Sequence, residues 1–134
     1  MAGQPQPGSN PWLTFDVTNC TIYETGLPPS TVIECTRPFS VDVDFVFAEM
    51  LAPWIVTFGV SCEVRVRFES LGTGPEVVSS PTTVTTVAGS LSYKGTVSMS
   101  AGTFTPGAYK MVCTVTIPGS PIAGYVEGPI IQMC

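Results

Sequence analysis

The chain has 134 residues, of which 44% are hydrophobic and only 11% are charged, and its five basic and ten acidic side chains give a net charge of −5. A chain of this length is expected to form one domain with a single core. The negative charge argues against a nucleic-acid partner, and no run of about 18 apolar residues predicts a membrane span. Because domains usually carry roughly 25% charged residues, the deficit indicates that another protein covers part of the surface.

Residues 1–11 are rich in Gly, Pro, Gln and Ser and are interpreted as an extended N-terminal arm before a single domain of residues 12–134. No basic region followed by an apolar run is visible at the start, so no signal peptide is expected. The compartment stays undetermined, with the cytoplasm slightly favoured.

The first strand is expected between residues 12 and 24, where apolar and polar residues alternate. The alternation changes phase once, and a β-bulge near Thr18 and Asn19 would explain the change. A turn at residues 26–29 then leads to a short return strand with Ile33 and Cys35 on one face. The apolar residues on either side of the bulge are Leu13, Phe15 and Val17, then Cys20 and Ile22.

Two strands have a period of two that no helix would give. Their inward faces are Phe39, Val41, Val43, Phe45 and Phe47 in one, and Cys62, Val64, Val66 and Phe68 in the other.

The outward faces of these two strands carry several charged side chains. Asp42 and Asp44 share one face, and with Glu63 or Glu69 as neighbours they offer a weak calcium site as a minor alternative. The pair of Arg65 and Arg67 suits an anion, although a solvated strand face is the favoured interpretation.

Between the two strands, the segment AEMLAPWIVTFGV (residues 48–60) breaks the alternation, and Pro53 argues against a central strand or a long helix. One interpretation is a loop with a helical turn that plugs the open end of the core. The other is an exposed apolar contact surface. The interface candidates in this segment are Met50, Leu51, Trp54, Ile55 and Phe58.

The last part of the chain predicts further strands. An edge strand over residues 77–87 is interrupted by Pro81, alternation resumes from Leu91 to Met99, and a final strand lies near residues 124–133. Neither edge segment carries the lysines that commonly prevent edge-to-edge pairing. The interface candidates near the C-terminus are Tyr125, Ile130 and Ile131.

The segment TFTPGAYKMVCTV (residues 103–115) places Tyr109 after a turn at Pro106 and Gly107 and before an alternating apolar ladder. It resembles the tyrosine corner of immunoglobulin-like and fibronectin type III-like domains. The resemblance implies that the Tyr109 hydroxyl bonds the backbone near residues 102–105. With the strand pattern, it predicts an all-β, immunoglobulin-like antiparallel sandwich of seven or eight strands.

Five cysteines form no CxxC pair, and the chain has no histidine, so no metal or cofactor is expected. The favoured interpretation is that most are reduced, buried thiols. A disulfide between Cys20 and Cys35 across the 26–29 turn is the alternative.

Without histidine the commonest general base is missing, and enzymatic activity is not expected. The sequence favours a structural or protein-interaction module that self-associates as a homo-oligomer or a subunit of a larger assembly, or that binds another protein partner. The alternative is a binding module for a small apolar ligand or carbohydrate, for which the aromatic candidates are Trp12, Tyr23, Trp54 and Tyr125.

Overall fold

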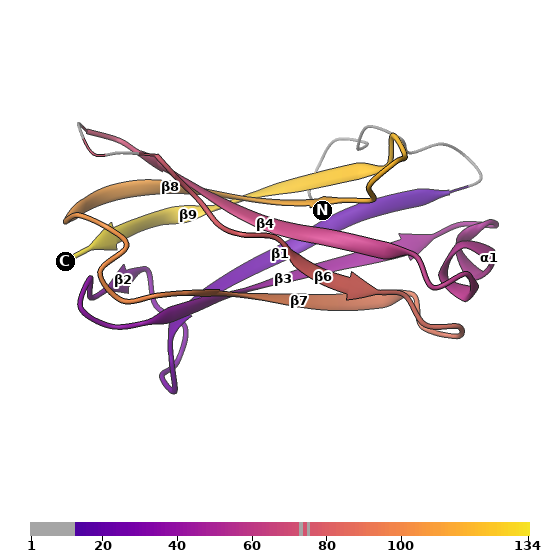
Figure 1. Ribbon diagram of the computed structural model, residues 1–134, viewed down its shortest axis with the longest axis horizontal. Helices are drawn as coiled ribbons and strands as arrows, with labels where there is room; N and C mark the ends of the chain where they lie inside the picture. The colour runs from indigo at the N-terminus through magenta and orange to yellow at the C-terminus, as the bar shows by residue number, and fades with distance from the viewer. Residues whose placement is uncertain (1–12, 73, 75) are drawn as a thin grey trace.

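The structure, a computed structural model, describes residues 13–72, 74 and 76–134. The expected 1–11 arm and Trp12 lie outside these residues. The described chain folds into two β-sheets that pack face to face, with one short helix at one end and the C-terminus at the other (Figure 1).

The first sheet has the strand order β1 (Thr14–Glu24), β3 (Phe39–Ala48), β7 (Ser92–Met99), and both pairings are antiparallel. The register of β1 against β3 shifts between Val17 and Asn19. The bulge expected near Thr18 is therefore confirmed, and it keeps Val17 and Cys20 both buried although they are three residues apart.

The second sheet has the order β2 (Val32–Ile33), β9 (Ala123–Met133), β8 (Gly107–Thr116), β4 (Ser61–Ser70), β5 (Val77–Val78), and β6 (Thr82–Thr85) also pairs with β4. The expected 77–87 edge strand is thus two short strands. Residues 79–81, with Pro81 among them, separate the two.

The short strand β2 corrects one sequence-based expectation. Instead of returning beside β1, it crosses to the second sheet and pairs in parallel with β9, Val32 opposite Gln132 and Ile33 opposite Met133. In the backbone pairing of the described residues, the connection meets β1 at one isolated bridge, between Tyr23 and Pro29. Two residues have no measurable period, so the sequence could not indicate their partner.

The core lies between the sheets. Every second residue of β3 and β4 is buried, as the alternation predicted. The core contains a cluster of three aromatic rings. Phe39, Phe68 and Phe104 contact one another at ring-centroid distances of 4.9 to 5.9 Å.

Tyr109 forms the corner that the sequence suggested. Its ring is 1% exposed and stacks edge-on against Phe104. Its hydroxyl donates to the Thr105 carbonyl at 2.8 Å, within the 102–105 segment where the bond was expected. Gly107, at φ 152°, begins β8 in a conformation that favours glycine. Two packed sheets whose strands pair mainly antiparallel, together with this tyrosine corner, make the fold an immunoglobulin-like β-sandwich.

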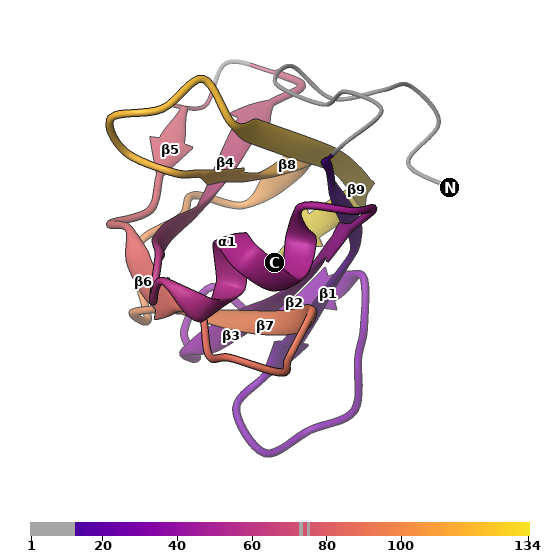
Figure 2. The same ribbon diagram turned by 90° about the vertical axis from the view of Figure 1, so that its right-hand side faces the viewer.

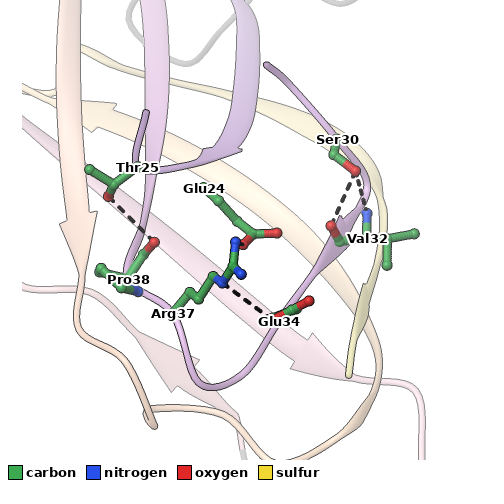
Figure 3. Close-up of polar contacts among 7 residues, drawn as sticks. All are labelled: Glu24, Thr25, Ser30, Val32, Glu34, Arg37 and Pro38. Atoms are coloured by element: carbon green, nitrogen blue, oxygen red, sulfur yellow. Dashed lines mark hydrogen bonds and ion pairs between the residues drawn. The ribbon is translucent and has the colours of Figure 1, made fainter. Parts of the chain in front are cut away.

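A polar cluster fixes the 25–38 connection (Figure 3), which lies at the end of the sandwich far from the helix (Figure 1). The Arg37 guanidinium lies 3.3 Å from the Glu34 carboxylate and 3.7 Å from the Glu24 carboxylate. Thr25 donates its hydroxyl proton to the Pro38 carbonyl, and the Ser30 hydroxyl bonds both the N–H and the C=O of Val32. These contacts hold the chain as it crosses from the first sheet to the second.

Candidate interaction surface

The helix α1 (Ala52–Thr57) lies across one end of the sandwich (Figure 2). Ala52 and Val56, four residues apart, share its inner face and are fully buried. Trp54 and Phe58 share its outer face and are 68% and 76% exposed. The two interpretations of this segment therefore apply to opposite faces of one helix, which is both a plug and an exposed apolar surface.

Two residues before the helix extend the outer face. Met50 and Leu51 are exposed, whereas Ile55 is partly buried and packs against the core. The helix has no side-chain cap, and no acidic or basic residue lies in its first or last turn. A six-residue helix is not stable alone, so its inner face must hold it in place.

The connection between β6 and β7 supports α1 from the side. The Thr86 hydroxyl donates to the Val56 carbonyl at 3.0 Å and accepts from the Val60 N–H at 2.7 Å. The next residue, Val87, is 62% exposed. Sequence reasoning missed Thr86 and Val87, because nothing in a Thr-rich edge segment signals contact with a helix 30 residues away.

We name the resulting surface the end patch. It consists of Met50, Leu51, Trp54, Phe58 and Val87.

The end patch contains a shallow groove of about 400 Å³, lined by Pro53, Trp54, Thr57 and Phe58. Its one polar side chain, Thr57, donates its hydroxyl proton to the Pro53 carbonyl at 2.6 Å. The groove is therefore suited to apolar contacts.

The C-terminal candidates divide between surface and core. Tyr125 and Ile130 are about half exposed on β9. Ile131 is fully buried opposite Tyr109, which removes its side chain from the interface candidates. The reason is the strand alternation itself, since neighbouring residues of β9 point to opposite faces.

The aromatic candidates for a ligand site are not together. Trp54 is on α1, next to the start of β1, whereas Tyr23 is at the far end of that strand and donates to the Asp42 carboxylate at 3.0 Å. A strand rises about 3.3 Å per residue, so roughly 30 Å separates these rings. Tyr125 lies on β9, and Trp12 is outside the described residues.

The charged candidates are also separated. Asp42 and Asp44 lie on the outer face of the first sheet, and Glu63 and Glu69 on the outer face of the second, so the suggested calcium cluster does not form. Among the described residues, no group of three or more side chains is placed to hold a metal ion.

Arg65 and Arg67 line a depression of about 230 Å³ on the second sheet. Each is within 4 Å of a carboxylate, Arg65 of Glu63 and Arg67 of Glu76. Their charge is already balanced, which agrees with a solvated strand face.

The cysteines are free thiols, so the suggested bond between Cys20 and Cys35 is absent. Cys20, Cys62 and Cys113 are buried, as expected for most of them. Cys20 contacts Cys113 across the sandwich, and the Cys35 N–H donates to the Cys134 carbonyl at 2.9 Å. The crossing of β2 to the second sheet separates Cys35 from Cys20.

No protein-family model matches the sequence, and comparison with curated proteins gives no match. Similar solved structures do exist. The C-terminal domain of Wzt aligns with 96% of this chain and 82% of its own length, at 10% identity and a TM-score of 0.59. A β-glucosidase, EmGH1 from Erythrobacter marinus, aligns with 91% of this chain at 9% identity and a TM-score of 0.55, but this chain spans only 16% of it. At such identities the likeness concerns the fold alone.

Within the part of the chain that the structure describes, no helix is both long and apolar enough to cross a membrane.

Proposed function

We propose that this chain is a non-enzymatic structural or interaction module whose end patch binds a second copy of the chain. The observation that carries the proposal is the outer face of α1, where Trp54 and Phe58 are more than two-thirds exposed beside other apolar side chains. Isolated exposed apolar residues are normal, but a contiguous group at one end of a domain is typical of a contact surface.

The size of the end patch limits the strength of this association. Trp54 and Phe58 expose roughly 300 Å² together, and the whole patch exposes on the order of 500 Å². A standard interface buries about 800 Å² on each partner. The patch supplies the apolar centre of such an interface, and surrounding residues must supply the rest, so we expect a dissociation constant in the micromolar range.

The charge distribution favours a second copy as the partner. Residues 50–60 carry no charged side chain, although the whole chain has a net charge of −5. Two copies that meet through residues 50–60, related by a two-fold axis, therefore bring no like charges of this segment together, and the nearest charge along the chain is the exposed Glu49. The low overall fraction of charged residues is consistent with a surface that is partly covered.

A small apolar ligand is the second candidate, because the groove of about 400 Å³ falls in the size range of ligand pockets. A carbohydrate is less well supported. Sugar recognition needs several free polar groups, and the only polar side chain lining this groove, Thr57, already donates to Pro53.

The proposal is tested with Trp54→Asp. The variant should remain folded by circular dichroism, because Trp54 is mostly exposed, and should dissociate at concentrations where the original chain is associated. Leu71→Asp is the matched control, since Leu71 is 58% exposed and lies at the opposite end, where its N–H bonds the Ala108 carbonyl. Equal loss of association in both variants would contradict an interface at the end patch.

A further inference from the structure

A pocket at the open edge between the two sheets has a cysteine in its wall. The pocket has a volume of about 280 Å³. It is lined by Cys20, Thr21 and Ile22 of β1, by the connecting residues Pro29, Ser30 and Thr31, and by Pro129 of β9. Cys20 is 8% exposed and lines this pocket, which makes the pocket the candidate route by which a small reagent would reach a thiol of the core.

A bulge in β9 makes room for the Cys20 sulfur. Between the pairs Val112–Glu127 and Lys110–Ile130, the extra residues Gly128 and Pro129 face Met111. A Cβ atom at Gly128 would lie 2.9 Å from the Cys20 Sγ and 2.5 Å from the Met111 Cε. The sulfur therefore occupies space that any other residue at position 128 would fill, and bulges often lie beside functional sites.

This position brings two thiols together. Met111 and Cys113 are two residues apart on the inward face of β8, and both are fully buried. The Cys113 thiol donates a hydrogen bond to the Cys20 sulfur. Cys20 on the first sheet and Cys113 on the second thus form a contact pair, with only Cys20 open to the pocket.

The contact affects the two thiols in opposite ways. The hydrogen bond from Cys113 lowers the pKa of Cys20, although burial and the charge of Asp44 oppose the effect. The same bond, together with burial and the nearby charge on Cys20, raises the pKa of Cys113. Cys20 is therefore the thiol with more thiolate character, and the thiolate is the attacking species in thiol chemistry.

We propose that Cys20 is a thiol-modification site that reacts with small disulfides through this pocket, and that Cys113 is its resolving thiol. In the first step the Cys20 thiolate attacks one sulfur of a disulfide RSSR. A Cys20–SR mixed disulfide forms, the S–S bond of the reagent breaks, and RS⁻ leaves and takes up a proton.

In the second step the Cys113 thiol loses its proton and attacks the Cys20 sulfur. A Cys20–Cys113 disulfide forms and a second RSH leaves, so the protein loses two electrons and two protons while RSSR becomes two thiols. The negative charge on Cys20 is gone after the first step, which removes one of the causes that hold Cys113 protonated. Burial remains, so the second step should be the slower one.

The test treats the full-length chain with glutathione disulfide and follows each cysteine by mass spectrometry after acid quenching. We expect glutathione to appear first on Cys20 and then to be replaced by a Cys20–Cys113 link. Trypsin alone cannot identify the link, because no Lys or Arg separates Cys20 from Cys35 or Cys113 from Cys134. A glutamate-specific protease resolves this, since Glu24 and Glu127 lie between the members of these pairs.

Two variants at position 113 separate the roles of Cys113. In Cys113→Ser the hydroxyl can still donate a hydrogen bond to Cys20 but cannot form a disulfide with it. The mixed disulfide on Cys20 should therefore form at a similar rate and persist. In Cys113→Ala the donor is lost, and modification of Cys20 should slow several-fold. Equal rates in the Ser and Ala variants would contradict the role of the hydrogen bond.

Cys62 serves as an internal control for unfolding. It is fully buried, and burial raises its pKa to about 11. If the pocket gives access, Cys20 reacts much faster than Cys62. Modification of the two at the same rate, or a first link between Cys35 and Cys134, would overturn the proposal.

Discussion

Tyr109 shows how a single residue stabilises the turn that begins β8. Its hydroxyl donates to the Thr105 carbonyl, and the Thr105 hydroxyl lies 3.0 Å from the Tyr109 hydroxyl oxygen. Tyr109→Phe keeps the buried ring but leaves the Thr105 carbonyl without this donor. We expect a loss of about 1 kcal/mol in the free energy of unfolding, measured by urea titration. An unchanged unfolding midpoint would show that the corner is not a stabilising feature.

Arg37 is expected to matter more than other surface arginines. The Glu24 side chain is 12% exposed, and its Oε1 has no hydrogen-bond partner, so Arg37 is its charge partner. Arg37→Ala leaves a mostly buried carboxylate unpaired, which should cost about 1 kcal/mol after allowance for the exposure of Arg37 itself.

The control for Arg37 is Arg65→Ala. Its partner Glu63 is more exposed, at 31%, and the expected cost is below about 0.5 kcal/mol. The unfolding free energies of the two variants should be compared under the same buffer conditions, and equal losses would contradict a special role for Glu24.

Burial of Cys62 should make the free energy of unfolding decrease at alkaline pH. Its pKa in the folded chain is raised by burial from 9.0 to about 11. Below pH 9 the Cys62 thiol is protonated in both the folded and the unfolded chain. Between pH 9 and 11 the thiol loses its proton only in the unfolded chain. Stability from this residue is therefore present below pH 9 and falls by up to about 2 to 3 kcal/mol as the pH rises to 11.

The measurement is urea unfolding of the original chain and of Cys62→Ala from pH 8 to 11. The original chain should be the more stable at pH 8, and its advantage should shrink as the pH rises. A constant difference across this range would mean that Cys62 does not ionise on unfolding.

Among the elements, β7 depends on a glycine for its packing. A Cβ atom at Gly95 would lie 2.7 Å from the Val64 Cγ2 and 3.2 Å from the Val84 Cγ2, both on strands of the other sheet. Gly95→Ala should therefore cost about 1 to 3 kcal/mol, because a packed core does not accept extra volume.

Gly72→Ala is the control for Gly95, since nothing lies within 4 Å of a Cβ atom there. Its effect on thermal unfolding should be small. If Gly95→Ala is equally harmless, the two sheets are less closely packed at β7 than the structure indicates.

The strands that the sequence predicted are those with a strong local signal. β3 buries every second residue over its whole length, β4 does so from Cys62 to Phe68, and β8 from Tyr109 to Val115. The bulge near Thr18 is visible as a phase change. β2 was placed on the wrong sheet because two residues carry no period. The helix α1 was only partly foreseen, since a short apolar run does not reveal which of its faces is buried.

The candidate sites depend on contacts that no local pattern encodes. Val87 joins the end patch because Thr86 bonds to α1, and Cys113 meets Cys20 because a bulge in β9 at Gly128 leaves space between the sheets. Both result from the way two sheets stack. Ile130 and Ile131 were both named as interface candidates, but neighbouring strand residues point to opposite faces, and Ile131 is the buried one.

At the scale of the whole molecule, the two ends of the sandwich differ. One end carries the polar cluster around Arg37 (Figure 3) and the C-terminus. The other end carries α1 (Figure 1), whose outer face contributes to the apolar end patch. Among the described residues of a chain with only 11% charged side chains, the two most exposed aromatic residues, Trp54 and Phe58, lie at this second end. Association through that end would bury this surface and leave the charged strand faces in water.

The most direct test of this account is sedimentation equilibrium of the original chain over a concentration series from about 1 to several hundred micromolar, the range in which a patch of this size should associate. We predict a reversible rise in the average mass from one chain towards two, with a midpoint in the micromolar range, and a shift of that midpoint to higher concentration in Trp54→Asp. A mass of a single chain, 14.1 kDa, throughout the series would contradict self-association through the end patch.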